Sequence, residues 1–223
     1  MVNPGKTSNT AIKFALLTCL SIVSAACALP ADRYHPQYST YIQGIRSVLL
    51  LTPQITVLQD KPQGKPIWNE QASREATRLA GQAVRKVLLS KNLVVHVADP
   101  QLDAHPDVRD VQSLYPAVNR SIQLHTYGPQ IFPDKLESFE YGIGSVADLL
   151  AQRNAEALVL VTGFQVLSIP QPRDWISIAV AEATGNIIWY HLERDRRHLG
   201  MQTEAAVQAL VEPALRHFME NHR

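Results

Sequence analysis

Two short apolar runs flank a long amphipathic segment, and this order limits the folds that the chain can adopt. The runs Ser47–Leu51 and Leu93–Val97 are too brief for helices, so they predict buried strands. Between them, from Ala72 to Leu88, apolar residues recur at three- and four-residue steps. This is the spacing of a helix with one buried face, and Asn69 is placed to cap its start. Strand, helix and strand in this order predict a parallel pair.

The second half of the chain predicts antiparallel strands. Ala157–Ile169 is a long apolar run in which Gly163 is expected to make a bend or bulge. Trp175–Ala183 and Asn186–Leu192 are two further strands, joined by a turn whose Gly and Asn favour left-handed backbone. A helix over Thr203–Met219 follows, with one apolar side. The predicted fold class is α/β, with a mixed sheet that is parallel in its first half, an antiparallel C-terminal hairpin and helices packed on the sheet.

The N-terminal segment has the pattern of an export signal. Lys6 and Lys13 precede the uncharged run Phe14–Ala26, and Cys27 follows it. A membrane-spanning helix needs about 20 apolar residues, and this run is shorter. Cleavage is therefore the better interpretation, and residues 1–26 are predicted to be a signal peptide.

Residues Ser24, Ala25, Ala26 and Cys27 resemble the lipobox of bacterial lipoproteins, in which the cysteine becomes the first mature residue and is lipidated. Ser24 departs from the pattern, which usually has a larger aliphatic residue there. The resemblance implies lipidation of Cys27. Because Ala28 and not aspartate follows, it also implies the outer membrane, on the side that faces the periplasm. The alternative is an ordinary small-x-small cleavage site at residues 24–26 or 26–28, which would release a soluble protein.

Cysteine content, charge and proline content limit the structures and functions that the rest of the chain can have. Cys19 and Cys27 are the only cysteines, so the part after Cys27 has no internal disulfide and must be stabilised by packing. The formal net charge is +1, which gives no electrostatic reason to expect nucleic acid. Residues 27–41 hold two prolines and no apolar period. They are predicted to be the lipidated cysteine and a tether, and residues 42–223 a single α/β domain.

Residues 99–144 interrupt the pattern of that domain with an insertion rich in proline and aromatic residues. It contains five prolines and five aromatic residues, and only a short helix is expected, near Pro116–His125. The segment is too long for an ordinary connection. One interpretation is a packed excursion that covers an edge of the sheet. The other is a recognition surface, since aromatic loops on a rigid scaffold often bind partners.

Few residues suggest catalysis. The chain has no GxxxxGK[ST] phosphate loop, GxSxG elbow, HExxH or CxxC motif. Gly142–Ser145 has two glycines before an expected helix and is interpreted as a turn, with anion binding as the alternative. His191, Glu193 and Asp195 share one face if their strand extends that far, and could hold a metal or share a proton. The competing interpretation is a solvated hairpin end. His96, flanked by valines, is interpreted as a core or edge histidine. We therefore predict no catalytic, cofactor-binding or metal-binding residue.

A family resemblance follows from the order of these segments. The strand Ser47–Leu51, the amphipathic helix, the strands Leu93–Val97 and Ala157–Leu167, and the turn and strand of Thr184–Trp189 resemble periplasmic α/β lipoproteins. These are typified by the curli-secretion channel lipoprotein and the lipoprotein activators of penicillin-binding proteins. The chain departs from them in lacking long alternating strands suited to a membrane pore and in having the insertion at 99–144. The resemblance implies non-enzymatic work in the envelope.

Three functional hypotheses result. The first is a membrane-anchored periplasmic lipoprotein that acts as an adaptor, scaffold or activator of an envelope protein complex, with the insertion or a sheet edge as its contact surface. The second is an exported hydrolase or metal-dependent enzyme that uses His191, Glu193 and Asp195. The third is a carrier of a small ligand, with the insertion as its lid.

Overall fold

The computed structural model describes residues 32–61, 64–128, 132–167, 174–195 and 199–219. These described residues belong to one compact unit. The predicted signal peptide and the predicted lipidation site Cys27 lie outside the described residues. Both therefore stay predictions.

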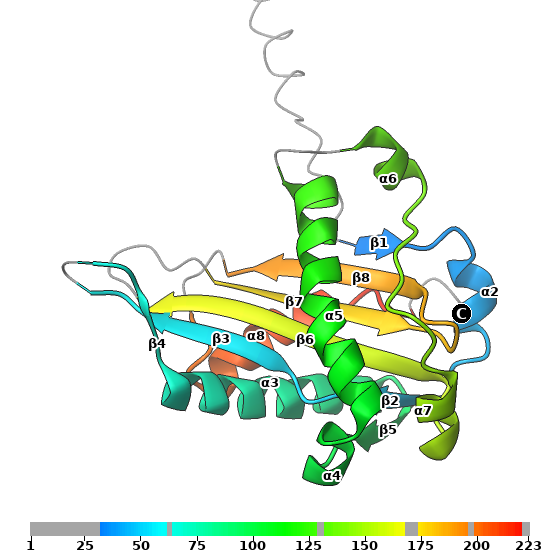
Figure 1. The fold of residues 1–223 in the computed structure, drawn as a ribbon, viewed down its shortest axis with the longest axis horizontal. Helices are drawn as coiled ribbons and strands as arrows, with labels where there is room; N and C mark the ends of the chain where they lie inside the picture. The colour runs from blue at the N-terminus through cyan, green and yellow to red at the C-terminus, as the bar shows by residue number, and fades with distance from the viewer. Residues whose placement is uncertain (1–31, 62–63, 129–131, 168–173, 196–198, 220–223) are drawn as a thin grey trace, which may run out of the picture. The chain divides into compact units, whose positions relative to one another are not determined.

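The described residues form an eight-stranded mixed sheet, which confirms the predicted fold class (Figure 1). Strand β2 pairs with β5 and β6 in parallel, and β3 also pairs with β6 in parallel. The pairs β6–β7, β7–β8 and β1–β8 are antiparallel. The order is β1-β8-β7-β6-β2-β5, with β3 also beside β6 and β4 beside β3. The bounds are β1 Asp32–Tyr34, β2 Ser47–Leu50, β3 Gln54–Gln59, β4 Ile67–Trp68, β5 Val94–Val97, β6 Ala157–Leu167, β7 Trp175–Ala181 and β8 Ile187–Arg194.

Strand β6 is long enough to pair with two strands in succession. Its start pairs with β2, where Val48 lies beside Ala157, and its second half pairs with β3, where Gln54 lies beside Thr162. Pro53 separates β2 from β3, because proline cannot donate to a sheet ladder. Beyond β3 the sheet continues only as the two-residue strand β4 among the described residues.

Helices cover the two faces of the sheet unequally. The helices α3 and α8 share one hydrophobic cluster with the first face. The helix α5 lies across the second face, whose cluster also includes residues of α4 and α7 (Figure 1). The helix bounds are α2 Tyr38–Ile42, α3 Glu70–Ser90, α4 Pro100–Asp103, α5 Pro106–Ile122, the π-helix η1 Gln123–Tyr127, α6 Pro133–Glu137, α7 Ala147–Gln152 and α8 Glu204–Leu215. The predicted cap of α3 is present, since the Asn69 side chain accepts a hydrogen bond from Ala72 N.

The prediction of a tether up to residue 41 is wrong from Asp32 onward. Strand β1 pairs with β8, with Asp32 beside His191, and Tyr38 and Ile42 of α2 are buried. The segment is too short to show an apolar period. Its partner strand lies more than 150 residues further along the chain, so local sequence gives no sign of the pairing.

The prediction of only a short helix in the insertion is also wrong, because α5 starts at Pro106 and continues through Pro116. Proline has no N–H to donate to the carbonyl four residues earlier. Here the Gln54 side chain donates to that carbonyl, on Gln112, over 3.0 Å. Buried side chains of α5 then pack on a face of the sheet rather than covering an edge. Of the aromatic residues in the insertion, Tyr115 and Phe139 are buried and Phe132 is 51% exposed.

Gly163 and Gly185 are predicted to form a bend or bulge and a tight turn, and the structure supports only the second prediction. Gly163 stays in register with β3 and β7, and the register shift of the hairpin lies at Val180/Ala181. A Cβ atom at Gly163 would lie 2.7 Å from Ile55 Cδ1, so close packing and not a bulge requires this glycine. In the turn, Gly185 has a φ of 88°, while Asn186 is not left-handed.

Candidate functional site

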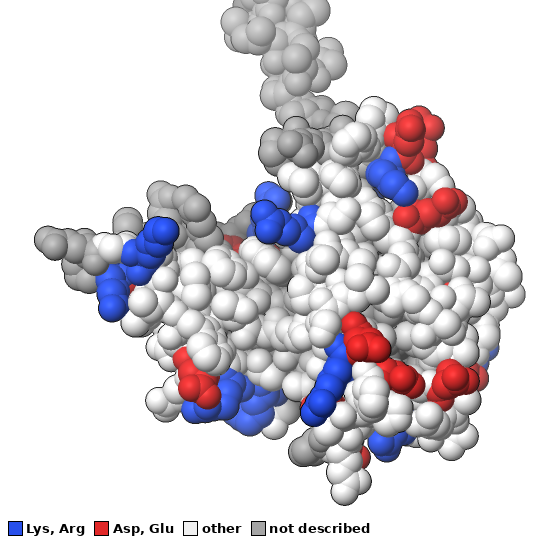
Figure 2. All heavy atoms as spheres, in the orientation of Figure 1, with Lys and Arg blue, Asp and Glu red and all other residues white. Residues whose placement is uncertain are grey.

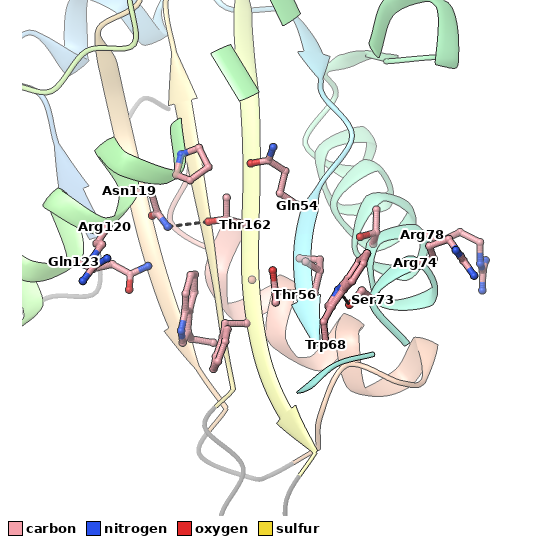
Figure 3. Close-up of a pocket in the computed structure, with 16 residues that line it drawn as sticks. Gln54, Thr56, Trp68, Ser73, Arg74, Arg78, Asn119, Arg120, Gln123 and Thr162 are labelled. Carbon is pink, nitrogen blue, oxygen red and sulfur yellow. Dashed lines mark hydrogen bonds between the residues drawn. The ribbon is translucent and has the colours of Figure 1, made fainter. Parts of the chain in front are cut away.

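An open groove of about 900 Å³ lies beside α5 on the second face of the sheet. Helix α5 crosses only part of that face, and the surface is hollowed on the side toward β4 (Figure 2). The walls come from α5, α3 and β4, and the floor comes from β3, β6 and β7 (Figure 3).

A row of side chains across four strands runs along the floor of the groove, from Thr56 to Trp175, and continues past the lining to Arg194. Thr56 of β3 lies beside Phe164 of β6, Phe164 lies opposite Trp175 of β7, and Trp175 lies opposite Arg194 of β8. Paired residues in a sheet point to the same face. The Phe164 and Trp175 rings are stacked, with centroids 6.4 Å apart and an interplanar angle of 19°. Thr56 and Arg194 are exposed, and the two rings are partly exposed.

Trp68 of β4 stands at the outer wall of the groove and is 61% exposed. Its indole Nε1 donates to Ser73 Oγ over 2.9 Å. The same hydroxyl accepts from Val57 N and donates to Asn69 O. The ring is therefore held in place while most of its surface faces solvent. A fixed, exposed tryptophan on a rigid element is typical of binding surfaces.

Asn119 fixes the α5 wall through a buried polar network. Its Nδ2 donates to Thr162 Oγ1 over 2.9 Å (Figure 3). Its Oδ1 accepts from Ser177 Oγ at 3.0 Å and from Tyr190 O–H at 2.8 Å. Thr162 and Ser177 also share a hydrogen bond of 2.7 Å. These bonds attach α5 to three strands, so the groove has a rigid inner wall.

The described lining of the groove carries positive charge. It includes three arginines and no aspartate or glutamate. Arg74 pairs with Glu70 and Arg78 pairs with Glu75 on the solvent side of α3. Arg120 is exposed and forms no ion pair with a described residue. Figure 2 shows Lys and Arg side chains on both sides of the hollow.

The predicted His191, Glu193 and Asp195 constellation comes together only in part. His191 is 3% exposed; its Nδ1 lies 3.0 Å from Asp32 Oδ1 and its Nε2 lies 3.2 Å from Glu193 Oε2. Burial alone would lower the pKa of His191, but the hydrogen bonds to Asp32 and Glu193 outweigh it and raise that pKa. The local sequence gave no signal for Asp32, because it lies in the segment predicted to be a tether.

This arrangement leaves His191 without a nitrogen for a substrate or a metal, since each ring nitrogen faces its own carboxylate. Asp195 is engaged elsewhere, because its Oδ2 accepts from Gly200 N over 2.7 Å. In the described part of the chain, no group of three or more His, Cys, Asp or Glu side chains could hold a metal ion. The prediction of a solvated hairpin end is wrong for His191, which is buried as a structural residue.

The other predicted residues also have structural surroundings. His96 is half-buried on β5, which ends the strand order. Gly142 forms an isolated bridge with Asn186, and Ile143 N donates to Gly185 O. The segment 142–145 thus packs against the turn of the β7–β8 hairpin through backbone contacts. No described helix is both long and apolar enough to cross a membrane.

Comparisons with known proteins give distant likenesses in structure alone. No family model and no curated protein matches the chain. The PelC dodecamer from Paraburkholderia phytofirmans is 8% identical with a TM-score of 0.38, over 82% of this chain and 91% of that chain. Lipoprotein GNA1162 from Neisseria meningitidis is 11% identical with a TM-score of 0.34, over 76% and 95%. The LpoB C-terminal domain from Escherichia coli is 12% identical with a TM-score of 0.29, over 71% and 92%. These similarities include a lipoprotein, but they are too low to transfer a function.

Proposed function

We propose that this chain is a bacterial envelope lipoprotein, anchored through Cys27 in the outer membrane and facing the periplasm, that acts as a non-enzymatic adaptor. It binds a protein partner in the groove beside α5. The observation that carries the proposal is the groove itself. A fixed and exposed Trp68, together with the stacked Phe164 and Trp175, forms an aromatic surface on a rigid sheet.

Aromatic side chains left facing water favour a partner that covers them. Burying apolar surface stabilises a complex by about 25 cal/mol per Å² before the costs of association are subtracted. Tryptophan and arginine are enriched among the residues that dominate binding energy. The floor is built on strands held by continuous ladders, so little ordering cost opposes binding.

The anchor rests on the sequence pattern at residues 6–27 and on chain length. Strand β1 starts at Asp32, five positions after Cys27. At no more than about 3.6 Å per residue, a lipid on Cys27 keeps the start of β1 within about 18 Å of its attachment point. Several acyl chains, at about 0.8 kcal/mol per buried methylene, make such attachment essentially permanent.

Fractionation of bacterial envelopes tests the anchor. The wild-type protein is expected in the membrane fraction, with a mature N-terminus at Cys27 and a mass increased by acyl chains. Cys27→Ser is expected to remain unacylated. A wild-type protein that starts at another residue, or carries an unmodified thiol, would contradict the anchor.

Photocrosslinking in cells tests the adaptor role. A photoreactive residue at Thr56 in the groove is expected to capture one protein reproducibly, and the same residue at Ser113 on the outer side of α5 is not. Trp68→Ala is expected to reduce the crosslink from Thr56. Equal capture from both positions, or none from Thr56, counts against the groove as the binding site.

A further inference from the structure

We propose that the occupant of the groove is an extended acidic peptide segment of the partner protein, with aromatic or other apolar side chains between its carboxylates. This inference rests on the proposed function and specifies the chemistry of the partner. It is carried by the charge of the lining, by the aromatic side chains Phe164, Trp175 and Trp68, and by the hydrogen bonds that already engage Asn119, Thr162 and Ser73.

The arginine side chains at the groove favour a partner segment with negative charge. Arg120 lines the groove and Arg194 lies beside Trp175 at the end of the floor row, and neither forms an ion pair with a described residue. No aspartate or glutamate is among the described lining residues, so the lining itself places no acidic side chain against a carboxylate that reaches Arg120. Arginine also presents a planar fork that binds a carboxylate through two parallel hydrogen bonds.

The aromatic side chains of the groove floor favour a peptide that has apolar side chains between its carboxylates. Phe164 and Trp175 are partly exposed in the middle of the row. Trp68 lines the same groove from β4, next to Ser73 (Figure 3). Aromatic rings in such positions favour stacked or edge-to-face partners. An apolar side chain of the peptide covers this part of the groove, while flanking carboxylates reach Arg120 and Arg194.

Three polar side chains of the lining, Asn119, Thr162 and Ser73, are poorly placed to bind an anionic glycan. Bound sugar hydroxyls need hydrogen-bond partners, because polar groups that lose water without replacement cost free energy. In this groove Asn119 and Thr162 are occupied by each other and by Ser177. Ser73 is occupied by Trp68, Val57 and Asn69. Asn119, Thr162 and Ser73 therefore have little hydrogen-bonding capacity left for a sugar, whereas the aromatic faces and Arg120 remain open to a ligand.

The edge of β3 disfavours addition of the peptide as a further strand at Val57. The outward-facing Val57 N donates to Ser73 Oγ, and Val57 O accepts from Asn69 N, both over 2.9 Å. These bonds occupy the groups that an added strand would need. The peptide therefore lies over the face of the sheet, and its side chains contribute more to binding than its backbone.

Binding of defined probes to the purified full chain in detergent tests the inference by fluorescence anisotropy. The probes are a short synthetic peptide of alternating glutamate and tryptophan, the same peptide with lysine for glutamate, the same peptide with alanine for tryptophan, and oligogalacturonate. The glutamate–tryptophan peptide is expected to bind most tightly, with an affinity that falls as salt is added. Arg120→Glu is expected to weaken its binding at least about tenfold. Arg109→Glu, the same change at an exposed position of α5 outside the groove, is expected to leave binding unchanged.

Arg120→Glu changes an exposed residue, so folding is preserved and circular dichroism checks this. Tighter binding of the lysine peptide or of oligogalacturonate overturns the inference, as does an affinity that Arg120→Glu leaves unchanged. The adaptor role has its own readout in the crosslink from Thr56. If a partner is captured at Thr56 but its binding is changed neither by added salt nor by Arg120→Glu, the result would contradict the acidic peptide as the occupant. That result would still support the adaptor role.

Discussion

The imidazole of His191 lies 3.0 Å from the carboxylate of Asp32, although 159 positions separate the two residues in the chain. This contact joins β1 to β8 beside the backbone ladder of the same two strands. Glu193 contacts the other ring nitrogen at 3.2 Å. The start of the fold is therefore attached to its last strand by a buried imidazole that lies between two carboxylates.

The stability of the protein should depend on pH through this contact. Because the folded state raises the pKa of His191, the full stabilisation is present below the unfolded pKa of about 6.5 and is lost as pH rises through the raised folded pKa. Asp32→Asn should lower the free energy of unfolding at pH 6 by about 1–3 kcal/mol. Urea unfolding at a series of pH values measures both effects.

His191→Gln should remove this part of the pH dependence, and Asp110→Asn, at an exposed carboxylate of α5, should leave it unchanged. Parallel pH profiles for the wild type and His191→Gln would show that the imidazole is neutral in the folded protein.

Asn119 should be a major determinant of the groove wall. Asn119→Ala removes the shared partner of the Thr162, Ser177 and Tyr190 hydroxyls in a buried site. The expected loss is about 2–4 kcal/mol of unfolding free energy, because buried polar groups left unpaired are costly. Ser113→Ala, on the exposed side of α5, should change stability by less than about 0.5 kcal/mol. Equal effects of the two substitutions in urea unfolding would exclude the network as the attachment of α5.

Gly163 should tolerate no side chain. In Gly163→Ala the added Cβ would lie 2.7 Å from Ile55 Cδ1 and 3.2 Å from the Trp175 carbonyl oxygen. We expect a loss of about 1–3 kcal/mol from overpacking, and a smaller added loss in the Ile55→Val background, which lacks the Cδ1 atom. Gly81→Ala is the matched control, since its Cβ would lie 3.6 Å from Pro53. It should stabilise α3 by about 0.5–1 kcal/mol. Thermal unfolding compares Gly163→Ala, Ile55→Val, the double variant of the two and Gly81→Ala with the wild type.

The sequence predicted the elements whose signal is local. The period of α3, the Asn69 cap, the run of β6 and the β7–β8 hairpin all depend on residues within one segment, and the structure confirms them. Strand β1 and the full length of α5 depend on distant partners. The Gln54 side chain compensates for Pro116 only because β3 lies next to α5 in the folded protein.

The groove was not predicted for the same reason. Thr56, Phe164, Trp175 and Arg194 form a row only through the register of four strands, and the exposed Trp68 lies on the two-residue strand β4. The predicted aromatic surface of the insertion instead contributes mostly to the core, with Tyr115 and Phe139 buried. A hydrophobic pattern identifies side chains that can be buried, but it does not tell which of them face a groove.

Cysteine labelling in intact cells tests most directly whether the groove binds a partner. After Cys27 the chain has no cysteine, so Thr56→Cys in the groove and Ser113→Cys outside it each introduce a single thiol in that part. We predict that a maleimide labels Thr56→Cys several-fold more slowly in cells than in the purified protein, while Ser113→Cys reacts equally in both. Equal labelling of Thr56→Cys in cells and in the purified protein would contradict the proposal that a partner occupies the groove.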